Sequence, residues 1–489
     1  MSYDVVVVGG GVGGLTVAAL LSARGFNVCL LERQSQVGGC IGRIGFGGYD
    51  FEPGMGLHTS WGPGEIYDRV FSELPVEAPE TRLIDSDYLI RFENSTDIPL
   101  RKTDGEFFDE LRKAFPECSE SAVQFYKLVS DLSQKWKSDA SEQRHGFLGR
   151  ALRGFQSVSR VDGVKEATRR TALSYASNTS PRFQRFVDAQ LNAFLQTSIS
   201  RCAFLPACIA LMVPRTNLYS IDGGTATIAE RLVESIKKSG GTIRLNSPVL
   251  RLAYNESGDA VGVDLLTGET VVAKRAIISN LTIWDTYGRL VGLHRTPAEI
   301  KSQLQENQSR GVYLICATVD ETARQRLPAQ NFLVAKSQTG SDIESISDEF
   351  TFTMGQPAVD GKTPTTIKTS SEVLPWFAFQ TSEEDYEERD QEALERFWTE
   401  IHRLLPELGS GIEVIETANP RTYYDQTRRK LGMVMGVEEI PARLNAGGQP
   451  STSIPNLFMV GDTVTSEGFG TPSVVSSSLA LANQLSKQC

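Results

Sequence analysis

A cluster of glycines near the N-terminus has the spacing of a loop that binds phosphate groups. The run Gly9-Gly10-Gly11-Val12-Gly13-Gly14 contains the pattern G-x-G-x-x-G. In this pattern Gly9 permits a tight turn, Gly11 lets the backbone approach a pyrophosphate, and Gly14 lets a helix and a strand pack closely. The helix that follows offers its first N–H groups and its partial positive charge to the phosphates.

The residues around the glycines predict a strand–helix–strand unit. Val5 to Val8 form an unbroken β-branched run, which is typical of a strand buried on both faces of a parallel sheet. Residues 15–24 have the apolar spacing of a helix that ends at Gly25, and residues 26–31 read as a second buried strand. Glu32 closes that strand, where its carboxylate can accept both ribose hydroxyls of an adenosine. The unit therefore predicts dinucleotide binding.

Two further segments identify the dinucleotide through a family resemblance. Glu32-Arg33, Gly38-Gly39 and the run Gly47-Gly48-Tyr49-Asp50-Phe51-Glu52-Pro53-Gly54 resemble the extended FAD motif of the amine oxidase and phytoene desaturase superfamily. Residues 456–462 end in Gly461-Asp462 and resemble the C-terminal flavin motif, whose aspartate contacts the ribityl chain and the pyrophosphate. The resemblance implies that the cofactor is FAD, bound by Gly9, Gly11, Val12, Gly13, Gly14, Glu32, Arg33, Gly38, Gly39, Val249, Gly461, Asp462 and Val474.

The resemblance also implies a fold and a division of the chain. The expected fold class is α/β, with a doubly wound, Rossmann-like FAD-binding domain of the glutathione-reductase or amine-oxidase type. Residues 1–75, 216–295 and 415–489 are expected to form this discontinuous domain. An inserted, mixed α+β substrate domain is expected from residues 76–215 and 296–414. Within it, the patterns predict helices at 104–115, 119–136 and 387–405 and strands at 311–320 and 376–380.

Within the superfamily, one branch fits best. Classical amine oxidases usually carry arginine directly after the paired glycines, whereas Cys40 stands there in this chain. That difference, the run that ends in Gly56-Leu57-His58, and residues 219–290 look more like phytoene desaturases, carotenoid isomerases and retinol saturases. In that branch a hydride passes between an allylic carbon of a long polyene and the flavin N5, and conjugation delocalises the cation. The implied substrate is a lipophilic isoprenoid.

Two residues are candidates for catalysis. His58 follows the segment that the resemblance places beside the flavin, and Glu467 lies in the loop expected next to it. Each also has an ordinary structural interpretation, as a hydrogen-bonded histidine and as a surface carboxylate. There is no second G-x-G-x-x-G, so a separate nicotinamide domain is not expected. Electrons then pass to oxygen, a quinone or another carrier, or the flavin ends each turnover in its starting state.

Composition excludes several other classes. The net charge of −11 and the pI near 5.2 argue against nucleic-acid binding. The seven cysteines include no C-x-x-C pair, so neither a metal site nor a disulfide framework is expected, and a reducing cytoplasm is the simplest location. No run of eighteen apolar residues occurs. An island of apolar and arginine residues within 144–160 suggests peripheral membrane contact, although an ordinary packed helix explains it too.

Two alternative functions remain open from the sequence. The first is a flavin amine oxidase, although no aromatic cage for an amine can be located. The second is a binding protein similar to the Rab GDP-dissociation inhibitors, which share the fold but hold no flavin. The complete glycine set and Asp462 argue against this second reading. Oligomeric state is not indicated by any pattern.

Overall fold

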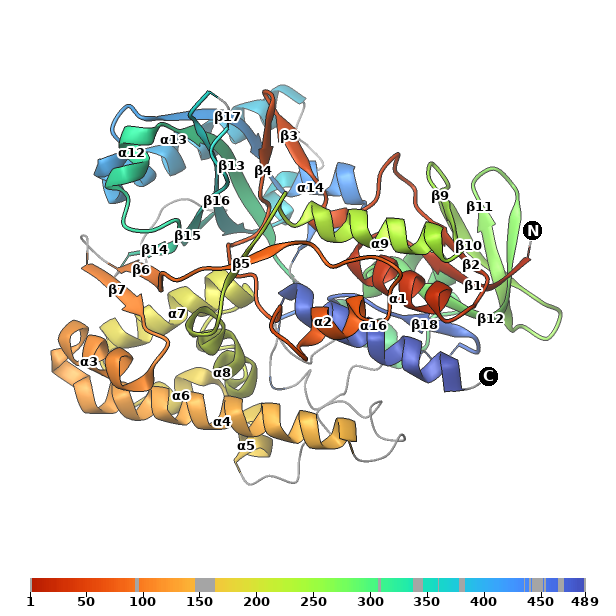
Figure 1. Ribbon diagram of the computed structural model, residues 1–489, viewed down its shortest axis with the longest axis horizontal. Coiled ribbons are helices and arrows are strands. Elements are labelled where there is room, and N and C mark those ends of the chain that lie inside the picture. Colours follow the sequence, from red (N-terminus) through yellow and green to blue (C-terminus); the bar gives the residue numbers. More distant parts are fainter. Residues whose placement is uncertain are drawn as a thin grey trace.

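The structure is a computed structural model that describes residues 2–487 except 93–95, 146–162, 307–308, 337–345, 359, 378–382, 435, 439–440, 442–451, 453 and 465–469. Two large sheets lie at opposite ends of the long axis, and both termini lie beside one of them (Figure 1). A group of helices lies below the other sheet, the one far from the termini, in the same view.

The first sheet has a parallel core of five short strands. These are β1 (Ser2–Val8), β2 (Val28–Leu31), β9 (Thr242–Arg244), β12 (Thr270–Ser279) and β18 (Leu457–Met459). The pairing order is β9-β2-β1-β12, and β18 adds in parallel to the last part of β12. Val8 pairs with both Leu31 and Ser279. Since parallel strands end at one edge, Gly9, Glu32 and Asn280 follow them there.

The two faces of this sheet bury alternate residues of each strand. Val5 and Val7 pack against helices α1 (Val12–Ala23), α9 (Ala226–Lys238) and α16 (Gly470–Lys487), with α2 (Ile66–Phe71) beside α16. Val6 and Val8 pack against β10 (Val249–Tyr254) and β11 (Ala260–Leu265), and against α10 (Ile283–Asp285) with the π-helix Thr286–Gly292. Continuous apolar strands are thus buried on both sides, as their sequence predicted.

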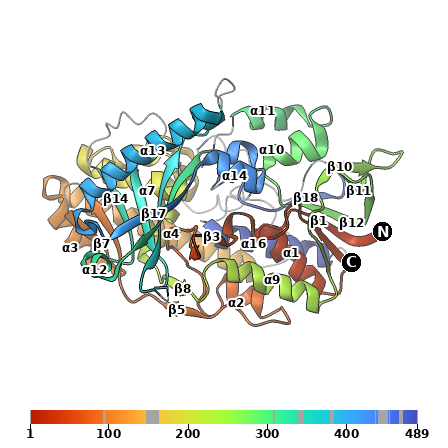
Figure 2. The same cartoon turned by 90° about the horizontal axis from the view of Figure 1, so that it is seen from above.

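The second sheet is mainly antiparallel, in the order β17-β13-β16-β15-β14-β6-β7. Its strands are β17 (Ile412–Ala418), β13 (Gly311–Val319), β16 (Thr363–Ser371), β15 (Ile346–Met354), β14 (Asn331–Ala335), β6 (Tyr88–Phe92) and β7 (Thr96–Leu100). Helices α12 (Glu321–Arg326) and α13 (Glu383–Leu404) pack on one face, and Figure 2 shows α13 lying across it.

The other face of β14 and β6 is covered by a bundle of helices rich in phenylalanine. The bundle contains α3 (Asp104–Ala114), α4 (Ser119–His145), α5 (Val164–Arg169), α6 (Ala172–Ala176), α7 (Pro181–Leu195) and α8 (Phe204–Met212). Every residue of α8 from Phe204 to Leu211 is buried. This apolar run is therefore a core helix of the bundle.

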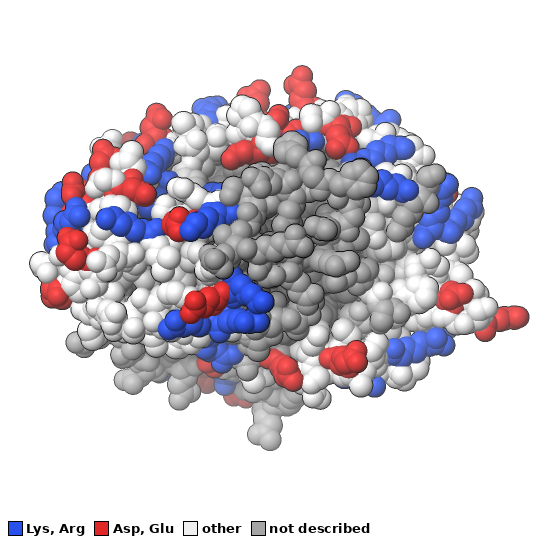
Figure 3. All heavy atoms as spheres, turned by 90° about the horizontal axis from the view of Figure 1, so that it is seen from below, with Lys and Arg blue, Asp and Glu red and all other residues white. Residues whose placement is uncertain are grey.

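The remaining elements are small. They are the pairs β3 (Ile44–Phe46) with β4 (Tyr49–Phe51) and β5 (Thr81–Leu83) with β8 (Tyr219–Ile221), and the helices α11 (Ala298–Glu306) and α14 (Pro420–Thr427). On the face shown in Figure 3, positive and negative side chains are interspersed. None of the described helices is long and apolar enough to cross a membrane.

One predicted element is wrong and others lie outside the described residues. Residues 376–380 were expected to be a strand, but Leu374–Phe377 form a 3-10 helix. The buried Trp376 ring stacks on Tyr313 and donates from Nε1 to Ser371, so its aromatic bulk fills a core position beside the sheet. The remainder of that predicted strand, and most of the 144–160 island, fall outside the described residues.

Candidate functional site

A cavity of about 830 Å³ lies where the first sheet meets the second. Its lining includes the glycine loop, residues 31–46, much of residues 52–61, the end of α7 and the residues after β12. Residues 426–429, 434 and 437, which precede the C-terminal strand, and residues 461–462 and 470–474, which follow it, complete the lining. The volume lies within the range of sites for cofactors and small molecules, about 300–1,000 Å³. Segments far apart in sequence therefore form one site.

The glycine loop cannot carry side chains at several positions. A Cβ on Gly14 would lie 2.1 Å from the Gly9 carbonyl oxygen, and a Cβ on Gly13 would lie 2.9 Å from Val474 Cγ1. Gly11 is the N-cap of α1, where no described side chain caps the helix and no acidic residue stands in the first turn. The first N–H groups of α1 are consequently free to meet an anion.

Glu32 is fixed beside this loop by backbone hydrogen bonds. The Gly10 N–H donates to Oε2 over 2.7 Å, and the Gln34 N–H donates to Oε1 over 2.8 Å. Each carboxylate oxygen retains a further acceptor position, because an ionised carboxylate can accept about four hydrogen bonds. Arg33 and Val249 line the same end of the cavity. This end has the polar groups that a ribose needs.

Asn280 was not singled out from the sequence, yet it lies at the centre of the loop. Its side chain would meet a Cβ on Gly11 at 2.7 Å from Nδ2 and a Cβ on Gly13 at 2.6 Å from Oδ1. It follows β12, where Asn280 N–H donates to the Val8 carbonyl. An asparagine after a strand is common, so only the strand pairing shows that it contacts the loop.

The C-terminal segment brings an acid and an arginine together. The Asp462 carboxylate accepts two hydrogen bonds from Arg429, from Nη1 over 3.2 Å and from Nη2 over 2.8 Å. Gly461 lies against the glycine loop, since a Cβ on Gly13 would come within 3.5 Å of its backbone nitrogen. Sequence reasoning selected Asp462 but missed Arg429, which stands 33 residues earlier in an irregular segment.

The segment that returns from β4 towards the cavity is anchored by Glu52. Its Oε1 accepts from the Thr225 hydroxyl at 2.8 Å and from the Gly54 N–H at 3.2 Å, and its Oε2 accepts from the Thr225 N–H at 3.0 Å. The Thr366 hydroxyl of β16 donates to the Glu52 carbonyl at 2.9 Å. Glu52 therefore ties residues 52–61 to α9 and to the second sheet.

Apolar side chains line the cavity wall that residues 52–61 share with α7 and β13. They include Met55, Leu57, Trp61, Phe194, Leu195 and Val312. His58 lines the same stretch, and its carbonyl accepts from the Tyr219 N–H. Trp61 stacks on Tyr67 with centroids 4.0 Å apart and an interplanar angle of 7°. Each ring covers one face of the other, so these two rings do not form the opposing walls of an aromatic cage.

Lys368 is a further residue that the sequence did not reveal. It lies on β16 and lines the cavity, and no hydrogen bond or ion pair with another described residue involves its ammonium group. Burial lowers the pKa of Lys368 to about 8, while the nearby Cys40 and Glu52 oppose the shift. A strand in which threonines alternate with other residues gave no signal that this lysine faces a cavity.

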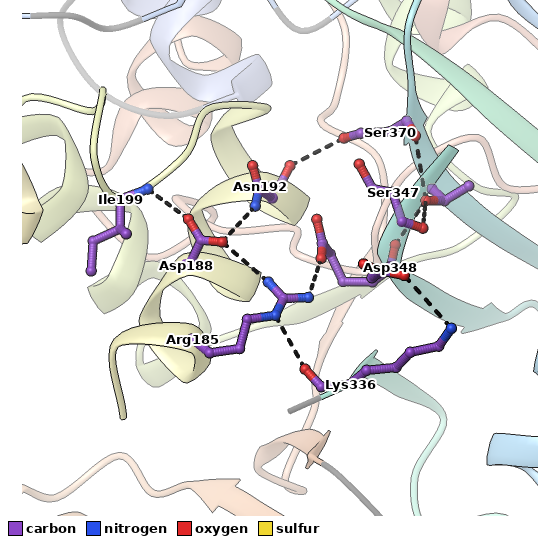
Figure 4. Close-up of polar contacts among 10 residues, drawn as sticks. Arg185, Asp188, Asn192, Ile199, Lys336, Ser347, Asp348 and Ser370 are labelled. Atoms are coloured by element: carbon purple, nitrogen blue, oxygen red, sulfur yellow. Dashed lines mark hydrogen bonds and ion pairs between the residues drawn. The ribbon is translucent and has the colours of Figure 1, made fainter. Parts of the chain in front are cut away.

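A polar network behind the wall positions α7. Arg185 donates from Nη2 to Glu349 over 2.6 Å, from Nη1 to Asp188 over 3.2 Å and from Nε to the Lys336 carbonyl over 3.1 Å (Figure 4). The Ser370 hydroxyl donates to the Asn192 carbonyl over 3.1 Å (Figure 4). Because α7 ends in Phe194 and Leu195, these contacts hold the apolar wall against the second sheet.

The predicted site residues can now be placed. All thirteen expected cofactor contacts except Gly14 line the cavity, and Gly14 packs directly beneath it against Gly9. His58 also lines it, whereas Glu467 lies outside the described residues. Among the described residues no group of three or more His, Cys, Asp or Glu side chains could hold a metal ion.

The residues present fit a flavin dinucleotide. The glycines leave room for a pyrophosphate at an uncapped helix start, and Glu32 offers acceptors for ribose. The opposite part of the cavity is apolar and would suit an aromatic ring system and a lipophilic molecule. The residues that would hold such a cofactor are the glycine loop, Glu32, Asn280 and Asp462.

Comparisons with known proteins give the same picture. The family described as "Flavin containing amine oxidoreductase" matches residues 12–485. The all-trans-retinol 13,14-reductase of Danio rerio is 24% identical over 95% of this chain and 83% of its own length. The chloroplastic prolycopene isomerase of Arabidopsis thaliana is 24% identical over 94% of this chain and 79% of its own length.

Solved structures share the fold. An oxidoreductase from Methanosarcina mazei superposes with a TM-score of 0.66 at 17% identity, covering 99% of this chain and 100% of its own. Putrescine oxidase bound to putrescine superposes with a TM-score of 0.67 at 14% identity, covering 100% and 99%. The expected α/β fold of the amine-oxidase type is thereby confirmed, while the boundaries expected between its domains stay a prediction.

Proposed function

The chain belongs to the family of flavin-containing amine oxidoreductases, and on that premise we propose that it acts on carbon–carbon single and double bonds of a lipophilic isoprenoid. It is an FAD-dependent oxidoreductase, so the alternative of a flavin-free binding protein is set aside. The observation that carries the substrate class is the pairing of an apolar cavity wall with relatives that are a retinol reductase and a prolycopene isomerase.

The chemistry divides between the cofactor and the chain. When bound, FAD accepts or donates the hydride. The glycine loop, Glu32 and Asp462 hold the dinucleotide, and the apolar residues Leu57, Phe194 and Leu195 orient a hydrocarbon and exclude water. Lys368 Nζ carries a proton that it can release near pH 8, which makes it our candidate for proton delivery. His58 and Glu467 remain candidates for the same task.

Contact with a membrane forms part of the proposal, because a polyene is delivered from a lipid phase. The 144–160 island is the proposed contact segment and a cytoplasmic location is proposed with it. Co-sedimentation with vesicles containing anionic lipid, compared between the intact protein and one with the island's arginines replaced by glutamine, tests this point. Equal sedimentation of the two would remove the island from the proposal.

Product analysis tests the proposed function directly. FAD-loaded protein is incubated anaerobically with carotenoids and retinoids dispersed in detergent, once with a reductant and once without. The products are separated by chromatography, and their masses are measured by mass spectrometry. We expect a change of mass by two hydrogens, or a changed double-bond geometry at constant mass. Unchanged polyenes together with oxidation of an amine would favour the amine oxidase alternative.

A further inference from the structure

Arg429 lies between the two segments that contact the glycine loop. Gly39 touches the loop, since a Cβ there would come within 3.4 Å of Gly11 Cα. Gly461 touches it near Gly13. The next residues after these two glycines are Cys40 and Asp462. Asp462 forms an ion pair with Arg429, and Cys40 lies close enough to Arg429 for the guanidinium to favour the thiolate form. Burial raises the pKa of the Cys40 thiol, and the guanidinium opposes that shift.

The Arg429 side chain is fixed by hydrogen bonds and is largely buried. Its Nε donates to the Met433 carbonyl over 2.6 Å, and its two terminal nitrogens donate to Asp462. Only 17% of the side chain is exposed. Burial alone would lower the pKa of Arg429. The neighbouring Asp462 carboxylate raises it and outweighs burial, so the guanidinium stays charged. A guanidinium has five N–H groups, and these contacts use three.

The arginine neutralises the charge of Asp462 beside the proposed phosphate site. Asp462 stands beside the start of α1, and a lone carboxylate there would repel a pyrophosphate dianion. A guanidinium fixed to that carboxylate cancels the repulsion and leaves N–H donors for phosphate oxygens. Position 40 faces the same cavity but carries a neutral thiol, so it supplies no charge.

We propose that Arg429 binds the pyrophosphate of FAD, and that it supplies from the C-terminal segment a positive charge that the neutral Cys40, on the other segment beside the loop, does not provide. This inference rests on the FAD cofactor alone. It is independent of the polyene substrate proposed above, so its failure would leave that proposal untouched.

The test moves the charge from one segment to the other. FAD affinity is measured by titrating FAD-free protein and following flavin fluorescence, for the wild type, Arg429→Gln and the double variant Cys40→Arg/Arg429→Gln. We expect Arg429→Gln to weaken binding about ten- to a hundred-fold, as for loss of charge-assisted hydrogen bonds. The salt dependence of binding should also fall. The relocated arginine in the double variant should restore most of the affinity.

A matched control separates binding from folding. Arg24 is 19% exposed and paired with Glu73 at 2.8 Å, much like Arg429, but it caps the far end of α1. Arg24→Gln should leave FAD affinity within about threefold of the wild type. The temperature at which bound flavin is released from loaded protein gives a second readout. The proposal is wrong if Arg429→Gln behaves like Arg24→Gln, or if the relocated arginine restores nothing, because Arg429 would then act only by shaping Asp462.

Discussion

The side-chain oxygen of Asn280 fills the space where a side chain on Gly13 would stand, with an ideal Cβ only 2.6 Å away. The contact joins the first turn of α1 to the residue after β12, at the edge of the sheet where the parallel strands end. It explains why position 13 must be glycine even though its backbone is helical. The same asparagine also blocks a side chain at Gly11, at 2.7 Å.

Gly13→Ala is expected to weaken FAD binding while the protein still folds. The added methyl group must displace Asn280 or Val474, at a cost of about 1–3 kcal/mol that corresponds to roughly 5- to 150-fold in affinity. Gly105→Ala is the control, because nothing lies within 4 Å of its Cβ. Titration of FAD into both variants checks the expectation. Equal affinities would show that the loop adapts freely.

Lys368→Met is expected to slow reduction of a polyene double bond by about a hundredfold, as for loss of a general acid, because reduction needs a proton as well as a hydride. The ammonium form predominates below the pKa of about 8, so wild-type activity should fall as the pH rises through that value. The variant should lack this pH dependence. Lys362→Met is the matched control, since Lys362 lies just before β16, is half exposed and pairs with Glu413. An unchanged pH profile in Lys368→Met would remove the lysine from the mechanism.

Glu349 is expected to make folding stability depend on pH. Burial raises its pKa from 4.5 to about 7, although Arg185 opposes the shift. A carboxyl whose pKa is raised in the folded state contributes most stability below its unfolded pKa, and that stability is lost as the pH rises through about 7. The midpoint temperature of thermal unfolding is measured for the wild type and for Glu349→Gln at about pH 5.5 and at about pH 8.5. The wild type's midpoint minus that of the variant should be lower at the higher pH, by about 2 °C or more.

Glu400 provides the control for this measurement. It pairs with Lys336 in the same region, and although burial alone would raise its pKa, its partners Arg403 and Lys336 lower it overall. Glu400→Gln should consequently shift the unfolding midpoint by the same amount throughout the window. A constant difference between the wild type and Glu349→Gln would contradict the account of the α7 network.

Cys40 is expected to report whether the cavity is occupied. It lines the cavity, whereas the other half-exposed cysteine among the described residues, Cys118, lies in the helical bundle. Burial raises the pKa of the Cys40 thiol, so labelling with a maleimide is best followed above neutral pH. Bound FAD should protect Cys40 and leave Cys118 unchanged, as judged by mass spectrometry. Equal labelling of Cys40 with and without FAD would show that the cofactor lies elsewhere.

The parts of the site that depend on local sequence were predictable. The glycine spacing, the buried strand before it and Glu32 lie within about thirty residues, so local patterns specify their geometry. The strand predicted at 311–320 is likewise observed, as β13 (Gly311–Val319). In contrast, the 376–380 prediction failed because aromatic residues suit both strands and core-filling turns.

Asn280, Lys368 and Arg429 could not be found in the same way. Asn280 reaches the glycine loop only because β12 pairs with β1, and Lys368 reaches the cavity only through the register of β16. Arg429 lies in a segment whose backbone is irregular, with Arg428 and Leu431 at positive φ. Such placements depend on long-range packing, which a single sequence does not specify.

The central claim is that this flavoenzyme exchanges hydride with a polyene. The most direct measurement is the flavin absorption spectrum after rapid anaerobic mixing of oxidised and of reduced holoprotein with a carotenoid or retinoid, and separately with an amine. We predict that a polyene alters the flavin redox state, or is itself isomerised by the reduced protein, while amines leave the spectrum unchanged. Bleaching of the oxidised flavin by an amine, with every polyene inert, would contradict the account.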